Sequence, residues 1–126
     1  MALATSDGKG DLHTRIVLCK EWSREGFVFF TNYDSRKGHD LADHPVAAAV
    51  FYWDPLFRQV KVSGHVQKTS RSESQAYWDS RPRESQLSQW ISKQSQPVAS
   101  RAELEKAWSE ADRQFANQKI PCPDHW

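Results

Sequence analysis

The sequence has few cysteines and no long apolar run. Its 126 residues include only 2 Cys, Cys19 and Cys122, and their spacing fits neither a metal-binding motif nor a disulfide scaffold. No stretch approaches the roughly 18 apolar residues that a transmembrane helix needs, and the first residues lack the basic region and apolar core of a signal peptide. We therefore expect a cytoplasmic protein in a reducing compartment, with no membrane partner.

The sequence also lacks an excess of charge. Lys and Arg total 17 against 16 Asp and Glu, a formal net charge of +1, so no global field would attract nucleic acid. The 5 His have no metal-ligand spacing, and no nucleophile–base set or acid pair suggests hydrolysis. We predict no metal site and no catalytic side chain, and redox chemistry would have to come from a cofactor.

Aromatic residues, by contrast, are plentiful. The chain has 6 Trp, 6 Phe and 3 Tyr, which argues against a disordered segment. Its length fits one compact domain. Hydrophobic residues make up 38% and the mean hydropathy is −0.78, so the chain alone has little apolar surface for a large core. We expect a partner subunit or a bound cofactor to complete that core.

The first half of the chain has the pattern of strands separated by turns, because runs of β-branched and aromatic residues alternate with Gly and Asp. We predict strands over Ala2–Thr5, Thr14–Trp22, Phe27–Thr31, Ala47–Trp53 and Arg58–Gln67. Between the third and fourth of these, Ser35 could cap a short helix over Arg36–Asp43, which must end before Pro45.

The second half has the pattern of helices. Ser70-x-x-Glu73 and Ser100-x-x-Glu103 each fit a capping box, so a helix is expected to begin at each serine. A further short helix is expected over Ser85–Ile91. Strands followed by helices indicate an α+β fold, with an antiparallel sheet or barrel and helices at one side.

Two cations in the first turn of the predicted helix are the most informative local feature. Arg36 and Lys37 follow Ser35, although a helix N-terminus carries partial positive charge and disfavours cations there. Exposed N–H groups, a hydroxyl and two cations together favour a phosphate site. Taken locally, a solvated basic turn remains the alternative.

Two other basic groups are less informative alone. Arg15 and Lys20 are five residues apart on one predicted strand, which puts them on opposite faces unless a bulge or twist intervenes, and each could be an ordinary surface cation. Tyr77 and Arg81 share a helix face, and Ser85 could cap the next helix, so these three residues could hold a second phosphate. Arg81 could equally interact with its own helix C-terminus.

Taken as an ordered series, these residues resemble the pyridoxamine 5'-phosphate oxidases. The segments that match in order and spacing are Arg15-Ile16-Val17-Leu18-Cys19-Lys20, Phe30-Thr31-Asn32, Ser35-Arg36-Lys37, Arg58-Gln59-Val60, Tyr77, Ser80-Arg81-Pro82, Ser85-Gln86 and Ser92-Lys93-Gln94-Ser95. Each segment is weak alone, but the ordered set is specific and covers nearly the whole chain. It outweighs the local alternatives.

The resemblance implies a split β-barrel of antiparallel strands with flanking helices that binds flavin mononucleotide (FMN), with residues 1–126 as a single domain made of strands over 1–68 and a helical part over 70–117. It implies a homodimer with FMN at the subunit interface. The implied reaction of vitamin B6 salvage oxidises pyridoxamine or pyridoxine 5'-phosphate to pyridoxal 5'-phosphate, with O2 as acceptor and H2O2 as product.

The family pattern also assigns residues. The implied FMN contacts are Arg15, Ile16, Val17, Leu18, Cys19, Lys20, Phe30, Thr31, Ser35, Arg36, Lys37, Gln59, Gln94 and Ser95. The implied contacts with the substrate phosphate are Lys20, Tyr77, Arg81 and Ser85. Lys20 would thus face both ligands.

The match to the family stops at both ends of the chain. Family members have a preceding helical segment and continue after Trp126 with closing strands, a Trp that contacts flavin and an Arg-x-His-Asp-Arg motif, so we expect a domain that is incomplete at its C-terminus. Three hypotheses follow: an oxidase, a flavin- or vitamer-binding module without turnover, and a structural or dimerisation partner that binds neither.

Overall fold

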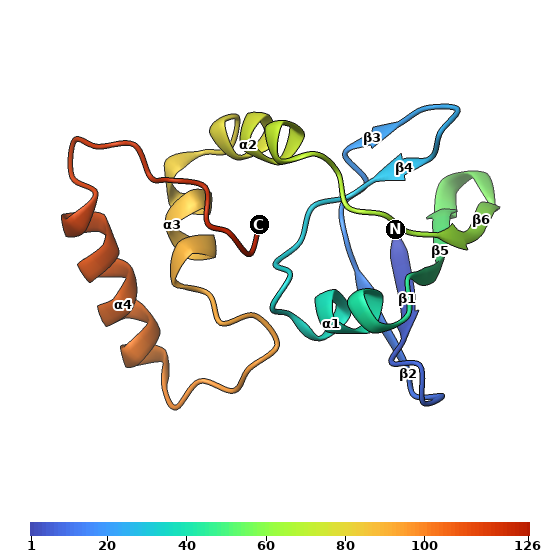
Figure 1. Cartoon of the computed structure of the whole chain (residues 1–126), viewed down its shortest axis with the longest axis horizontal. Helices are drawn as coiled ribbons and strands as arrows, with labels where there is room; N and C mark the ends of the chain where they lie inside the picture. Colours follow the sequence, from blue (N-terminus) through green and yellow to red (C-terminus); the bar gives the residue numbers. More distant parts are fainter. The chain divides into compact units, whose positions relative to one another are not determined.

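The computed structural model describes all 126 residues. The chain divides into two compact units, Met1–Lys68 and Thr69–Trp126, which are described separately. The first unit contains every strand and one α-helix, and the second contains three α-helices (Figure 1). None of the helices has the length and hydropathy needed to span a membrane.

A four-stranded antiparallel sheet forms the first unit. Its strands lie in the order β2-β1-β5-β6 and a separate hairpin pairs β3 with β4. The strands of the sheet are β1 (Ala2–Ser6), β2 (Leu12–Ile16), β5 (Val46–Trp53) and β6 (Arg58–His65), and those of the hairpin are β3 (Glu21–Trp22) and β4 (Phe27–Val28). A short 3-10 helix, η1 (Asp54–Leu56), joins β5 to β6.

The continuous strand predicted over Thr14–Trp22 is wrong, because the backbone changes partner within it. Val17 N–H donates to the carbonyl of Met1, which extends the pairing of β2 with β1, whereas Lys20 N–H donates to Val28 beside the β3–β4 hairpin. The residues between do not pair as a strand. The predicted strand Phe27–Thr31 likewise shortens to β4. Local β-propensity cannot report such a change of partner.

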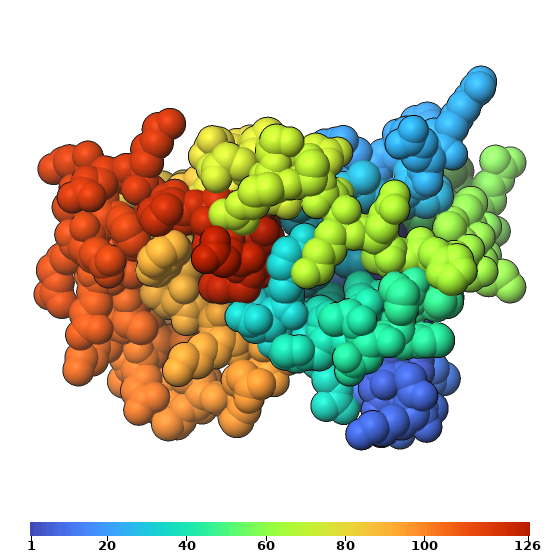
Figure 2. Space-filling view, in the orientation of Figure 1, coloured from blue at the N-terminus to red at the C-terminus, as the bar shows by residue number.

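Helix α1 (Arg36–Asp43) has the predicted bounds and packs against β1. The helix also lies close to the segment that precedes it, because residue 38 is glycine: a Cβ at Gly38 would collide with the backbone of Tyr33. Figure 2 shows the β1–β2 turn, in dark blue, against the far end of α1, where Gly8 lies near the side chain of His44. The face of β1 that carries Leu3 and Thr5 is therefore buried.

The second unit is built from α2 (Arg71–Asp79), α3 (Arg83–Ile91) and α4 (Arg101–Gln114). Trp78 is fully buried and its indole N–H donates to the carbonyl of Ile120 at 2.9 Å. Trp90 and Phe115 meet edge to face where α3 packs against α4. These contacts join the helices to the segment that follows α4.

The predicted caps are mostly confirmed. Ser70 and Glu73 form a reciprocal capping box at the start of α2, and Ser100 accepts from the backbone N–H of Glu103 at the start of α4. The prediction that Ser85 caps a helix is wrong. Helix α3 begins earlier, with Pro82 at the N-cap position, and Ser85 lies inside its first turn. Pro82 has a fixed φ and no N–H to satisfy, which suits the residue just before the first helical residue, Arg83.

Candidate functional site

The start of α1 holds a set of polar groups with defined roles. Ser35 is fully buried, and its Oγ donates to the carbonyl of Asn32 at 2.6 Å and accepts from the backbone N–H of Gly38 at 3.3 Å. Lys37 Nζ also donates to this hydroxyl, at 3.2 Å. The helix N-terminus and a buried ammonium group therefore meet at one serine.

Positive charge accumulates beside this serine. Burial, together with the positive charge of Arg15, lowers the pKa of Lys37 from its ordinary 10.5 to about 8. Burial also lowers the pKa of Arg15, with the carboxylate of Asp40 acting in the opposite sense. Arg36 on the same helix is more than half exposed. Such a group of cations is one that an anion would stabilise.

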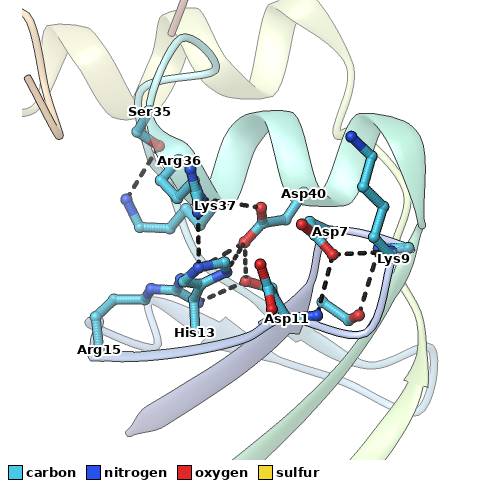
Figure 3. A network of polar contacts seen from close by, with 12 residues as sticks. Asp7, Lys9, Asp11, His13, Arg15, Ser35, Arg36, Lys37 and Asp40 are labelled. Carbon is cyan, nitrogen blue, oxygen red and sulfur yellow. Dashed lines mark hydrogen bonds and ion pairs between the residues drawn. The ribbon is translucent and has the colours of Figure 1, made fainter.

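One buried carboxylate lies among these cations (Figure 3). Asp40 has a side chain that is 2% exposed, and its Oδ2 accepts from the hydroxyl of Thr5 at 2.6 Å. The same oxygen lies 3.3 Å from Nδ1 of His13 and 3.8 Å from Nη2 of Arg15, and Oδ1 lies 3.8 Å from Nε of Arg36. Asp40 thus contacts strands β1 and β2 as well as its own helix.

Each arginine has a second contact that links it to Asp40 through an intermediary. Arg15 Nη1 donates to Thr5 Oγ1 at 2.8 Å and to the carbonyl of Leu3 at 3.2 Å. Arg36 Nη2 lies 2.9 Å from Nε2 of His13. The guanidinium groups are therefore held by a network that joins two strands and a helix.

The structure brings together only part of the predicted FMN set. Arg15, Ser35, Arg36 and Lys37 belong to the cluster at α1. Gln59 lies on β6, at the opposite sheet edge from β2. The remaining predicted contacts lie in three other segments: Ile16, Val17, Leu18, Cys19 and Lys20 run from the end of β2 toward β3, Phe30 and Thr31 follow β4, and Gln94 and Ser95 lie between α3 and α4 of the second unit.

The predicted substrate residues of the second unit lie around Arg81. Its guanidinium contacts the Tyr77 hydroxyl and the Ser85 carbonyl, both at a long 3.4 Å, and its buried Nε has no hydrogen-bond partner. The guanidinium carbon lies 4.7 Å from the centre of the Trp126 ring, which stacks on Tyr77. An arginine that stacks on aromatic rings and makes only long hydrogen bonds still has N–H groups with which to bind an anion.

A pocket of about 380 Å³ opens beside this arginine, lined by Arg81, Glu84, Ser85, Ser88, Gln89 and Ser92. Its lining is mostly hydroxyl and amide groups with one cation and one carboxylate. Lys20, the fourth predicted substrate contact, belongs to the first unit, where its side chain is exposed.

Sequence reasoning missed Thr5, His13 and Asp40. His13 has no metal-ligand spacing, yet it lies two residues before Arg15 on one strand, and Asp40 lies four residues after Arg36 on one helix. Both spacings put the pairs on common faces. These spacings could have indicated the two pairs, but joining the pairs into one cluster requires knowing that α1 covers that face of the sheet.

Comparison with known proteins identifies the family. The model of the pyridoxamine 5'-phosphate oxidase family matches residues 1–115. The chain belongs to this family. Pyridoxine/pyridoxamine 5'-phosphate oxidases are 51% identical in Trichormus variabilis and 48% identical in Pseudomonas paraeruginosa over 126 residues, which is 100% of this chain and 59% of each relative. The chain therefore spans about three-fifths of the length of these curated relatives.

Two solved structures share the fold of this chain. PhzG from Burkholderia lata, in complex with tetrahydrophenazine-1-carboxylic acid, matches 98% of the chain and 60% of its own with a TM-score of 0.92 and 26% identity. A pyridoxamine 5'-phosphate oxidase-related, FMN-binding protein from Nostoc punctiforme matches 82% of the chain and 58% of its own, with a TM-score of 0.67 and 19% identity. The predicted α+β fold of the split-barrel class is confirmed.

Proposed function

We propose that this chain is the FMN-binding part of a pyridoxine/pyridoxamine 5'-phosphate oxidase. The observation that carries the proposal is the cation cluster at α1, in which Lys37 is buried and Arg15 is partly buried. Lys37 and Arg15 lie close enough for Arg15 to lower the Lys37 pKa, and a phosphate would compensate both charges. The family membership supports phosphate of FMN as that anion.

The residues that would hold the FMN phosphate are Arg15, Ser35, Arg36 and Lys37. Ser35 fixes the start of α1, whose N–H groups carry partial positive charge. The family resemblance adds further proposed FMN contacts: Phe30, Thr31, Gln59, Gln94, Ser95 and the segment Ile16–Lys20. When bound, FMN supplies the acceptor for two electrons from the substrate and passes them to O2, giving H2O2.

We propose that Arg81, with Tyr77 and Ser85 of the same unit, contacts the substrate phosphate; the family resemblance adds Lys20 as a further proposed contact. Arg81 has a buried Nε–H without a hydrogen-bond partner, and its two other hydrogen bonds are long. Its donors can therefore bind a phosphate without breaking strong hydrogen bonds. The proposed substrates are pyridoxamine and pyridoxine 5'-phosphate, which present a phosphate dianion suited to a guanidinium. The product would be pyridoxal 5'-phosphate.

A homodimer in the cytoplasm, with FMN between the subunits, completes the proposal. The first unit supports a partner because it leaves many large apolar side chains exposed, among them Ile16 at 77%, Trp22 at 79% and Phe57 at 89%. Exposed apolar surface of this extent is typical of an interaction surface. The proposed single domain over residues 1–126 would then contribute part of each subunit of the dimer.

The test has two stages. The purified chain is mixed with FMN, and retention of the yellow cofactor after gel filtration supports the proposed binding; a chain that stays colourless contradicts it. Pyridoxine 5'-phosphate is then added under air, and H2O2 is measured. Peroxide release supports the oxidase, whereas bound flavin without peroxide favours the flavin-binding module without turnover.

A further inference from the structure

Asp40 presents an electrostatic contradiction. Its carboxylate is almost fully buried within 4 Å of two arginines that the proposed function assigns to the FMN phosphate. A negative charge at this place weakens the attraction of the cluster for an anion. If only net charge mattered, the site would bind phosphate more tightly without Asp40, so the carboxylate needs another explanation.

The contacts of Asp40 supply that explanation. Thr5 donates to Asp40 and accepts from Arg15, so the hydroxyl is aligned by the carboxylate and in turn aligns the guanidinium. A hydroxyl that donates to a carboxylate is a better acceptor for a second donor. Arg15 therefore depends on Asp40 for its direction as well as for its charge balance.

His13 connects the carboxylate to the other arginine. Its Nε2 lies 2.9 Å from a guanidinium nitrogen of Arg36, which can only donate, so this imidazole nitrogen accepts. The proton of the neutral ring is then on Nδ1, which faces Asp40 at 3.3 Å. That contact has no good hydrogen-bond alignment, so the negative charge of the carboxylate acts on the N–H dipole of the ring rather than through a hydrogen bond.

We propose that Asp40, acting through Thr5 and His13, is a positioning residue that orients Arg15 and Arg36 toward the FMN phosphate (Figure 3). The inference rests on the proposed function. It assigns three residues outside the predicted FMN set, from β1, β2 and α1. Their role is to fix the direction of two long side chains that would otherwise lose rotamer freedom on binding.

The experiment measures FMN and riboflavin affinity of the full chain by quenching of flavin fluorescence. Riboflavin lacks the phosphate, so the ratio of the two dissociation constants isolates the phosphate contribution. The variants are Asp40→Asn and two matched pairs, Thr5→Val with Thr5→Ser and His13→Leu with His13→Gln. Ser keeps the hydroxyl, and Gln keeps one donor and one acceptor. Glu105→Gln removes an exposed carboxylate of α4 as the charge control.

We expect Asp40→Asn, Thr5→Val and His13→Leu to weaken FMN roughly tenfold each with little change for riboflavin, as for loss of a charge-assisted contact. Thr5→Ser and His13→Gln should stay within about threefold of the unmodified chain because the hydrogen-bonding groups remain. In the unmodified chain, long-range ¹⁵N NMR should show His13 protonated at Nδ1.

Several results would overturn the inference. Tighter FMN binding by Asp40→Asn would show that the carboxylate only offsets positive charge. Equal losses for FMN and riboflavin would indicate a purely structural role, as would equal losses within each matched pair. A His13 proton on Nε2 would exclude the proposed link to Arg36. If Asp40→Asn does not fold, the two matched pairs decide. An unmodified chain that binds no FMN contradicts the proposed function itself, and the inference falls with it.

Discussion

Lys37 gives the proposed FMN site a pH dependence that can be calculated from its environment. In the ligand-free chain, burial and the charge of Arg15 lower the pKa of Lys37 to about 8. A phosphate dianion beside the ammonium group favours the charged form and returns the pKa toward its ordinary 10.5. Binding of FMN above pH 8 must therefore take up a proton.

The size of the effect follows from the fraction of Lys37 that is charged. With a pKa of about 8, roughly nine-tenths of the side chain is charged at pH 7 and about one-tenth at pH 9. The dissociation constant for FMN should accordingly rise about tenfold between pH 7 and pH 9. Below pH 7, protonation of Lys37 is nearly complete, so this residue contributes no further dependence.

Fluorescence titration of FMN at a series of pH values measures this rise. Lys37→Met should bind more weakly at pH 7 and lose the rise, because no group remains to be protonated on binding. Riboflavin should show no comparable rise, since it lacks the phosphate. A dissociation constant for FMN that is flat from pH 7 to pH 9 would refute the reasoning, and a rise that persists in Lys37→Met would show that another group takes up the proton.

The same shift bears on the stability of the ligand-free chain. The lowered pKa means that, between about pH 8 and 10.5, the unfolded chain binds a proton that the folded chain does not. The free energy of unfolding attributable to Lys37 therefore increases with pH over that window. Urea unfolding at pH 7.5 and pH 9.5 should show this gain in the unmodified chain but not in Lys37→Met.

Three further predictions concern other positions. Arg36→Ala should weaken FMN retention, whereas Arg81→Ala should chiefly raise the KM for pyridoxine 5'-phosphate, each by a contact worth roughly 1.5 to 3 kcal/mol; equal effects of both on FMN would contradict the division into two phosphate sites. Ser70→Ala should lower the free energy of unfolding by about 1 kcal/mol in urea, because it removes the capping box, and no loss would show that the cap is dispensable. Gly38→Ala should destabilise the chain and weaken FMN, since the added methyl group would meet the backbone of Tyr33; unchanged thermal unfolding would contradict this close approach.

The parts of the fold that the sequence predicted are those determined by neighbouring residues. Helix α1 has the predicted bounds because a serine cap and a following proline lie within a few residues of its ends. The strand predicted over Thr14–Trp22 failed because its residues change from pairing with β1 to pairing beside β4. That change depends on Met1 and Val28, which lie outside the predicted strand, so no local pattern contains it.

The candidate site shows the same limit. Arg36 and Lys37 were predicted to favour a phosphate because two cations in a first helical turn are unfavourable alone. Asp40 was not identified, since its hydrogen bond to Thr5 joins residues 35 positions apart. The register of β1 with β2 places Thr5 opposite His13, and this pairing brings the side chains of Thr5 and His13 under α1. Charge patterning thus pointed to the cluster that the candidate site is built on, and sheet register determined the contacts within it.

If the cluster at α1 binds the FMN phosphate as proposed, it would also explain how a nearly neutral chain selects an anion. The net charge of the chain is only +1, so long-range attraction contributes little. The cluster contains three positively charged side chains, those of Arg15, Arg36 and Lys37, and one negatively charged side chain, that of Asp40. Lys37 and Asp40 are buried. Buried charges are screened less by salt than exposed pairs such as Arg101–Glu105 on α4. Under the proposed function, selectivity for phosphate would therefore arise from the fixed directions of a few donors rather than from the field of the whole protein.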